Sequence, residues 1–190
     1  RVAAAVDPIL RPAAALRRLR HGCDNVPNQP PHLPRRRTEV SISPLVGTLS
    51  RLRQTFDSGK TRTVEWRLAQ LAEIERMMRE HEDDIATALR ADLGKCRFEA
   101  VMTEMSFVAA EAKYARKNLR KWMRAKKVRT PIMAQPGHSY LWPEPKGVVL
   151  IIAPWNYPMS MVMAPLVGAV AAGNCAVMKP SEVTANTSAL

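Results

Sequence analysis

The chain has 190 residues, of which 46% are hydrophobic and 24% charged, and its 29 Lys and Arg against 17 Asp and Glu give a formal net charge of +12. This length suits one domain, or one domain with a tail, and the hydrophobic fraction excludes a chain that is disordered throughout. Three cysteines are too few for a disulfide scaffold and match no zinc-binding spacing, which favours a reducing compartment. The high charge suggests nucleic acid or an anionic surface as a partner, so its distribution along the chain matters.

Half of the excess charge lies in residues 1–37, which hold eight Arg, two acidic residues, six of the fifteen prolines and no serine. We therefore assign residues 1–40 to an Arg- and Pro-rich extension outside the fold. Its first half is rich in Ala, Leu and Arg, as organelle transit peptides are; a disordered extension and a gene-model artefact are the alternatives. No secretory segment follows, so we expect a cytoplasmic, plastid or mitochondrial protein and no export. Because the chain begins with Arg1, we expect its natural start to lie upstream.

Residues 41–137 are predicted to be mainly helical. A first helix opens at Ser43-Pro44, an N-cap followed by a proline, and ends at Gly59. A second helix begins near Thr63 and continues to Gly94, and a third runs from about Phe98 to Arg124. Apolar residues recur in all three at steps of three and four and form buried stripes, namely Leu45, Leu49, Leu52 and Phe56, then Val64, Leu68, Leu71, Ile74, Met78, Ile85 and Leu89, then Val108, Ala112, Ala115, Leu119 and Trp122.

The end of the third predicted helix and the residues after it carry nine basic side chains and no acid between Glu111 and Arg129. A basic helix face can bind phosphate backbones non-specifically, but we favour a solvated outer face. Only Tyr114 and Trp122 could stack on bases, and no helix-turn-helix, zinc-finger or RNP signature accompanies them. A basic, non-enzymatic module that binds nucleic acid or an anionic membrane is the alternative function.

Residues 147–178 contain no charge and no histidine. Length and apolarity alone would fit a membrane element, but prolines at positions 154, 158 and 165 would break the backbone ladder of a continuous span. We interpret the block as a strand at 147–152, of the kind buried on both sheet faces, a hydrophobic helix at 159–172 and a second buried strand at 175–178. The predicted fold class is therefore α/β, with N-terminal helices followed by the first βαβ unit of a parallel Rossmann-like sheet over residues 147–190.

Ligands of such sheets bind beyond the carboxyl ends of the strands, where the loops 153–158 and 179–182 are expected. The first loop offers the amide of Asn156, and the second offers an ammonium, a hydroxyl and a carboxylate. An acid after the second strand of a dinucleotide fold accepts hydrogen bonds from ribose hydroxyls, and Glu182 is so placed. The glycine fingerprint of an ordinary dinucleotide-binding turn is absent from the sequence. The residues alone thus indicate a βαβ nucleotide-site candidate.

At these loops the sequence resembles the aldehyde dehydrogenase superfamily. Pro154-Trp155-Asn156-Tyr157-Pro158 matches that family's P-W-N-[FY]-P element, and Ala171-Ala172-Gly173-Asn174 followed by Lys179-Pro180-Ser181-Glu182 matches A-A-G-N…K-P-S-E. Upstream, Trp66-Arg67 and Ala91-Asp92-Leu93-Gly94-Lys95 look like the class 3 branch, including its plant members. The resemblance covers roughly residues 43–190 and implies an incomplete aldehyde dehydrogenase fold.

The resemblance implies an NAD(P)-dependent enzyme that oxidises aldehydes to carboxylic acids through a thiohemiacetal and a thioester. Asn156 matches the family's oxyanion-hole asparagine. Lys179 and Glu182 match the pair that holds the adenosine ribose, with Ser181 between them. A carboxylate at 182 disfavours a 2′-phosphate, so NAD is favoured, with NADP possible. The remaining matched positions form the wall along the cofactor, namely Ile152, Ala153, Pro154, Trp155 and Asn156.

The family's nucleophilic cysteine and general-base glutamate lie beyond position 190 in chain order. The resemblance therefore implies that this chain is an N-terminal fragment, inactive alone. We expect Cys175 to be a buried core residue, Cys96 to be structural or merely exposed, and Cys23 to lie in the extension. None of the four histidines has a spaced ligand partner, so no metal site is predicted.

Residues 138–146 read as an edge strand. In the family this region contributes to the sheet that joins subunits, so the resemblance implies a homodimer for the complete enzyme. An aldehyde substrate is implied in the same way. We predict neither a nucleic-acid partner nor a stable membrane span.

Overall fold

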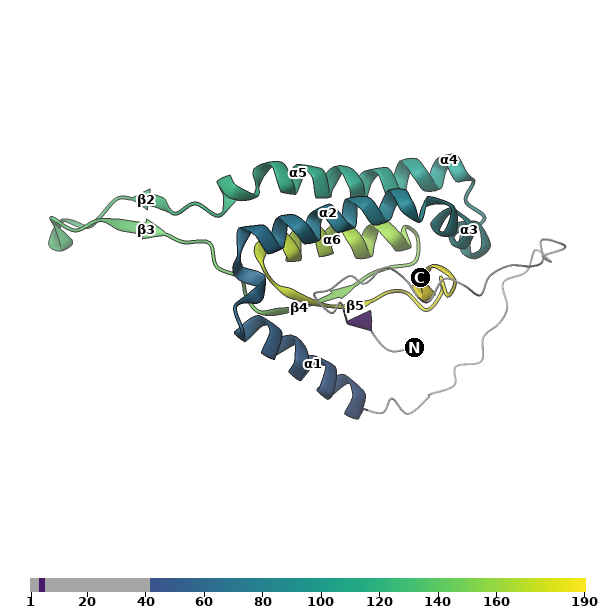
Figure 1. Cartoon of the computed structure of the whole chain (residues 1–190), viewed down its shortest axis with the longest axis horizontal. Helices are drawn as coiled ribbons and strands as arrows, with labels where there is room; N and C mark the ends of the chain where they lie inside the picture. The colour runs from purple at the N-terminus through teal and green to yellow at the C-terminus, as the bar shows by residue number, and fades with distance from the viewer. Residues whose placement is uncertain (1–3, 6–41) are drawn as a thin grey trace.

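The computed structural model describes residues 4–5 and 42–190, and it has the mixed α/β architecture that the sequence predicts (Figure 1). Short strands and longer helices follow one another along the chain. In order, the elements are β1 (Ala4–Ala5), α1 (Ile42–Asp57), a 3₁₀ turn (Lys60–Arg62), α2 (Val64–Glu80), α3 (Glu82–Leu93), α4 (Arg97–Ala100), a π-helical turn (Val101–Met105), α5 (Ser106–Trp122), β2 (Lys126–Val128), a 3₁₀ turn (Ile132–Ala134), β3 (Ser139–Leu141), β4 (Val148–Ile152), α6 (Pro158–Ala172), β5 (Cys175–Lys179) and a 3₁₀ turn (Thr187–Ala189).

The predicted βαβ unit is present. Strands β4 and β5 are parallel, with Val148 opposite Cys175 and Ile152 opposite Lys179, and α6 connects them. Pro158 is the first residue of α6, where its missing N–H removes no helical hydrogen bond. The other edge of β5 pairs antiparallel with β1, so two residues of the predicted extension join the sheet. The rest of that extension, with Cys23, lies outside the described residues.

The helices form layers on both sides of the sheet. Helix α6 packs on one face of β4 and β5, α2 and α5 cover α6 from outside, and α1 lies on the opposite face (Figure 1). Buried apolar residues from α2, α3, α5, α6 and both strands form one continuous core that includes Leu71, Leu119 and Leu166. The βαβ unit is thus held between the helices that precede it in the chain.

The predicted second helix is two helices, so the expectation of one uninterrupted helix from Thr63 to Gly94 is wrong. Its start is confirmed, since the Thr63 hydroxyl accepts a hydrogen bond from the Trp66 N–H as an N-cap. Helix α2 ends at Glu80 and is capped by His81, whose N–H donates to the carbonyl oxygen of Met77, and α3 begins with Glu82-Asp83-Asp84. Three acids in a first turn favour the positive end of a new helix. The apolar stripe crosses the break, because Ile85 and Leu89 are buried like Met78 before them.

The predicted third helix has an irregular start. It consists of α4, the π-helical turn and α5, and the predicted inner residues Val108, Ala112, Ala115 and Leu119 are all buried. Trp122 is the exception: it is 42% exposed and its ring lies 5.8 Å from that of Tyr114. Its placement on the buried stripe was therefore wrong, because α5 ends at this residue, where the helix extends beyond the buried core.

The predicted burial of the first strand on both faces is also wrong. Leu150 and Ile152 of β4 are 61% and 67% exposed, whereas Ile151 between them is buried. Side chains alternate across a strand, so α6 covers the face that carries Ile151, whereas α1 covers the opposite face only in part and leaves Leu150 and Ile152 exposed. The apolar run therefore predicted the strand correctly, but it did not predict how much of each strand face other elements bury.

Residues 126–141 form a hairpin that projects from the end of α5 (Figure 1). The predicted edge strand is present as β3, and its partner is β2, with Lys126 opposite Leu141. The nine basic side chains between 113 and 129 are exposed, as expected of a solvated outer face, and Arg116 and Arg120 pair with Glu75 and Glu65 of α2. In the part of the chain that the structure describes, no helix is long and apolar enough to cross a membrane.

Candidate functional site

The two predicted ligand loops lie side by side at the carboxyl edge of the sheet. The parallel register brings the ends of β4 and β5 together, and the Ala153 N–H donates to the carbonyl oxygen of Lys179 at 3.1 Å. Residues 153–157 leave β4 on one side of this contact, and residues 180–186 leave β5 on the other. Every residue singled out from the sequence as a site residue therefore belongs to one edge of one strand pair.

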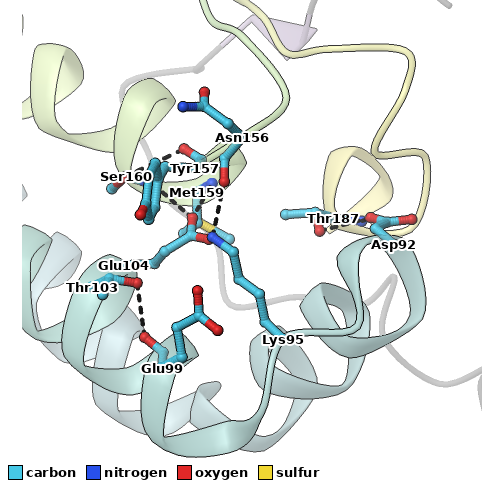
Figure 2. Close-up of polar contacts among 10 residues, drawn as sticks. All are labelled: Asp92, Lys95, Glu99, Thr103, Glu104, Asn156, Tyr157, Met159, Ser160 and Thr187. Carbon is cyan, nitrogen blue, oxygen red and sulfur yellow. Dashed lines mark hydrogen bonds and ion pairs between the residues drawn. The ribbon is translucent and has the colours of Figure 1, made fainter.

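Asn156 lies in the first loop with its side chain exposed. Figure 2 shows the side-chain amide on the far side of the backbone from Lys95, while the backbone carbonyl oxygen accepts a hydrogen bond from Lys95 Nζ at 2.9 Å. Among the described residues, the side-chain amide makes no hydrogen bond, so its N–H groups are available to an incoming acceptor. Ile152, Pro154 and Trp155 are also exposed, and Ala153 is buried beneath them.

A buried ion pair lies directly under this loop. Lys95 Nζ is 2.5 Å from Glu104 Oε1, and the two residues are only 8% and 0% exposed. The second carboxylate oxygen, Oε2, accepts hydrogen bonds from the backbone N–H groups of Met159 at 2.8 Å and Ser160 at 3.3 Å (Figure 2). The ammonium group also lies 4.0 Å from the centre of the Tyr157 ring, within the range of a cation–π contact.

The second loop holds Lys179 and Glu182 as an exposed ion pair, with Nζ and Oε2 2.7 Å apart. The hydrogen bond from Lys179, its positive charge and a backbone hydrogen bond lower the pKa of Glu182, so the carboxylate is ionised at neutral pH. Ser181 between them is buried: its hydroxyl accepts from the Val183 N–H and its carbonyl oxygen accepts from the Ser188 hydroxyl. Ser181 thus shapes the loop from inside.

The carboxylate of Asp92 fastens the far end of the second loop to helix α3. Oδ1 accepts hydrogen bonds from the backbone and side-chain N–H groups of Asn186, and Oδ2 accepts from the backbone N–H and the hydroxyl of Thr187. Four hydrogen bonds to one carboxylate hold the chain after β5 against the N-terminal helices.

The opposite, amino-terminal edge of the strands is held by a second set of contacts. Asn174 Oδ1 accepts from the backbone N–H groups of Lys146 at 2.6 Å and Gly147 at 2.9 Å, which closes the start of β4 onto the start of β5. The Thr61 hydroxyl donates to the carbonyl oxygen of Gly173 at 2.8 Å. Hydrogen bonds therefore fix the two strands at their amino-terminal ends as well as at the end that carries the candidate site.

The cysteines behave as predicted where the structure describes them. Cys175 is buried in β5, and burial raises the pKa of its thiol, so it is a poor nucleophile. Cys96 is exposed next to Lys95. Across residues 4–5 and 42–190, no group of three or more His, Cys, Asp or Glu side chains is placed to hold a metal ion.

Comparisons of the sequence and of the structure with known proteins both point to one family. The family model described as "Aldehyde dehydrogenase family" matches residues 49–190, which is well over half of the chain. The chain belongs to the aldehyde dehydrogenase family. Aldehyde dehydrogenase family 3 member B1 of Bos taurus is 46% identical over 146 residues, which are 77% of this chain and 31% of that protein. The predicted class 3 resemblance is thereby confirmed.

Solved structures of the aldehyde dehydrogenase family have the same fold. The substrate-bound Staphylococcus aureus AldH aligns with a TM-score of 0.71 and 41% identity, over 75% of this chain and 31% of that one. The P. syringae indole-3-acetaldehyde dehydrogenase AldA, solved with NAD+ and IAA, aligns with a TM-score of 0.66 and 26% identity, over 74% of this chain and 28% of that one. This chain therefore spans about 30% of the length of the relatives it matches.

Sequence reasoning missed the polar residues that support the aldehyde dehydrogenase loops from behind. Glu104 precedes Val108 by four residues and therefore lies on the same inner stripe of the helix, and Arg67 lies between Val64 and Leu71 in the same way. A charged residue in register with a buried stripe was the available signal. No comparable pattern identified Lys95, which lies in a loop between helices.

Proposed function

We propose that this chain is the amino-terminal part of an enzyme that oxidises aldehydes to carboxylic acids with a nicotinamide dinucleotide. The observation that carries the proposal is the contact of Ala153 with Lys179, which brings the Asn156 loop beside the Lys179–Glu182 pair. Family membership supports the same reaction, since the bovine relative is named an aldehyde dehydrogenase and AldA was solved with NAD+. Ligands of parallel sheets bind at this edge.

Asn156 is the proposed catalytic residue of this chain. When a nucleophile adds to an aldehyde carbonyl, negative charge develops on the carbonyl oxygen, and a fixed N–H donor stabilises that charge. The exposed, unengaged amide of Asn156 is such a donor, and its backbone is fixed by Lys95. Its carboxamide has the chemistry of an oxyanion-hole group.

The second loop fits the ribose of a dinucleotide. Glu182 presents an ionised carboxylate that can accept from two ribose hydroxyls, and Lys179 beside it can donate. Ser181 shapes this loop, and the exposed Ile152, Pro154 and Trp155, with buried Ala153, form the wall beside it. The bound nicotinamide would supply the two-electron oxidant. A carboxylate at 182 repels a 2′-phosphate, so we propose NAD as the preferred cofactor.

The nucleophile is proposed to come from another part of the enzyme. Cys175 is buried with a raised pKa, and the family pattern puts the nucleophilic cysteine and the general-base glutamate beyond residue 190. The 190-residue chain alone is accordingly predicted to oxidise no aldehyde. Production of NADH from an aldehyde by the purified 190-residue chain would contradict this placement.

The test uses a full-length enzyme, by which we mean the natural polypeptide that continues past residue 190, or a fusion of this chain to the corresponding C-terminal part of the bovine relative. We expect aldehyde-dependent NADH formation, and a loss of about 10²–10³ in kcat for Asn156→Ala. Asn118→Ala is the matched control, because within residues 42–190 the Asn118 side chain donates only to the Tyr114 carbonyl of its own helix, α5. Absence of NADH formation by the full-length enzyme, or full activity of Asn156→Ala, would overturn the proposal.

We also propose that the complete enzyme is a homodimer joined through the hairpin of β2 and β3. Tyr140, Leu141 and Trp142 are exposed on this projecting element, and exposed apolar side chains of this kind mark protein interfaces. Sedimentation of the full-length enzyme should give a dimer, and Leu141→Lys should shift it towards monomer. A monomeric wild-type enzyme at micromolar concentration would contradict the proposal.

A further inference from the structure

We propose that the buried Lys95–Glu104 pair is a positioning device that holds the Asn156 turn, residues 156–160, in the conformation that presents the Asn156 amide. The inference rests on the proposed function, because it assigns these two residues a role in presenting the proposed oxyanion donor. It concerns residues that touch neither aldehyde nor cofactor. They act through the backbone of the loop above them (Figure 2).

The partners of the pair point to this role. Apart from each other, and among the residues that the structure describes, the side chains of Lys95 and Glu104 bond only to the Asn156 turn. The ammonium donates to the Asn156 carbonyl and faces the Tyr157 ring, and the carboxylate accepts from the N–H groups of Met159 and Ser160. The two residues thus hold both ends of one turn. Because the carbonyl of residue 156 is fixed on one side of the backbone, its side chain is directed to the other side, as Figure 2 shows.

Glu104 also replaces a missing helix cap. Helix α6 begins after Tyr157, which makes no side-chain capping bond, and its first residue is Pro158, which has no N–H. The next two N–H groups, of Met159 and Ser160, are satisfied by Glu104 from a different helix. A carboxylate at this end is also favoured by the helix dipole. The start of α6, and with it the Asn156 turn, therefore depends on a residue 55 positions upstream.

The local backbone is irregular where it supplies both residues. Glu104 lies in the π-helical turn Val101–Met105, and Lys95 follows Gly94, which has a left-handed conformation. π-Helical turns are rare and concentrate at functional sites. Glu104 is fully buried within this turn and bonds to the loop, so the irregular segment is the one that supplies the support of the Asn156 turn.

Stability alone does not account for the pair. Removing two charges from water carries a desolvation penalty, and buried ion pairs can often be replaced by apolar residues of similar volume without loss of stability. The double variant Lys95→Met/Glu104→Leu should therefore still fold, at a cost set by the Met159 and Ser160 N–H groups that lose their acceptor, and it no longer holds the Asn156 carbonyl or caps α6. This separates positioning from folding.

Kinetics of the full-length enzyme provide the first test. Lys95→Met and the double variant should each lower kcat about 10–100-fold, with the KM values for aldehyde and NAD changed less than about threefold, because misplacement of a catalytic group by about 1 Å has effects of this size. Adding Asn156→Ala to either should lower kcat no further than Asn156→Ala alone, since both changes disable one donor. Leu119→Ala is the control, because it opens the core at the far end of α5 without touching residues 156–160.

Three kinetic outcomes would overturn the inference while the proposed function stands. These are an unchanged kcat in the double variant, a full multiplicative loss when Asn156→Ala is added, and a fall in kcat for Leu119→Ala as large as that for Lys95→Met. Complete inactivity of the wild-type full-length enzyme would instead refute the proposed function.

Hydrogen exchange on the full-length enzyme tests the backbone role without any measurement of activity. Glu104→Gln and the double variant should each raise the exchange rates of the Met159 and Ser160 amides by roughly tenfold or more, while those of Leu166 and Val167 in the middle of α6 stay within about threefold. Unchanged protection of Met159 and Ser160 in both variants would show that the pair does not hold the turn, whatever the enzyme does.

Discussion

The guanidinium group of Arg67 in α2 lies against the backbone of Gly173, at the turn where α6 ends and β5 begins. Arg67 is buried: Nε donates to the carbonyl oxygen of Thr61 at 3.0 Å, and Nη1 donates to that of Ala171 at 3.3 Å. Burial lowers the pKa of the Arg67 guanidinium, but it stays protonated at neutral pH. This contact fastens the N-terminal helices to the βαβ unit.

Gly173→Ala should destabilise the protein by about 2 kcal/mol or more. Gly173 has φ +84°, a left-handed conformation that costs other residues about 1–2 kcal/mol, and an added Cβ would overlap the Arg67 guanidinium. Urea unfolding followed by circular dichroism measures the change.

Gly168→Ala in the same helix is the matched control for Gly173→Ala. A Cβ at Gly168 would meet no atom within 4 Å, so this change should stabilise the helix by about 0.5–1 kcal/mol. Equal changes in the free energy of unfolding for the two substitutions would show that neither the left-handed turn nor the contact with Arg67 requires a glycine at position 173.

Glu75→Gln should lower the free energy of unfolding by roughly 1 kcal/mol at neutral pH. Burial raises the pKa of Glu75, but hydrogen bonds and charges from Arg116 at 2.6 Å and Arg79 at 3.0 Å outweigh it, so the folded-state pKa is lowered. Arg116 belongs to α5, so this pair ties α5 to α2.

The pH dependence of the Glu75→Gln effect has a definite sign. A depressed folded-state pKa means that the unfolded chain binds the proton more tightly, so the stabilisation is complete above the unfolded pKa of about 4.3 and is lost as pH falls through the folded value. The difference between the wild type and Glu75→Gln should therefore persist from pH 8 to about pH 5 and vanish in stronger acid. Glu80→Gln, in an exposed pair with Arg76, is the control and should change stability by less than about 0.5 kcal/mol.

Native alkylation should separate the two described cysteines. Cys96 is exposed and should react with iodoacetamide at pH 8, whereas Cys175 should not react until the protein unfolds, because burial both shields its sulfur and raises its pKa. Peptide mass spectrometry resolves the sites. Rapid labelling of Cys175 in native protein would contradict the prediction, because it would show that burial in β5 does not protect this thiol from the reagent.

Glu182→Gln should shift cofactor preference of the full-length enzyme towards NADP. Removing the charge eliminates its repulsion of a 2′-phosphate, and we expect the ratio of kcat/KM for NADP to that for NAD to rise about tenfold, or roughly 1.4 kcal/mol. The exposed Glu144, between β3 and β4, gives the control Glu144→Gln, whose ratio should stay unchanged. An unaltered ratio in Glu182→Gln would place the ribose elsewhere.

The βαβ unit and its two loops were predictable from local pattern. An uncharged run from Gly147 to Met178 broken by prolines admits few other folds, and the residues after each strand must lie at one edge of a parallel pair. Local sequence was therefore enough to predict the family, the strand–helix–strand order, the stripe from Leu71 to Met78 and the sheet edge to which the loops of Asn156 and Glu182 belong.

Which charged residues are buried, and which groups they bond to, depends on long-range packing. Glu104 and Lys95 bond to residues about 55 to 61 positions away, and Arg67 bonds to a carbonyl 104 positions away, so no local rule could predict these partners. The exposure of Ile152 and Trp122 was hidden for the same reason, since coverage of a face depends on where other elements pack. Periodicity reports which residues share a face, whereas burial and long-range hydrogen bonds depend on what the folded chain brings against that face.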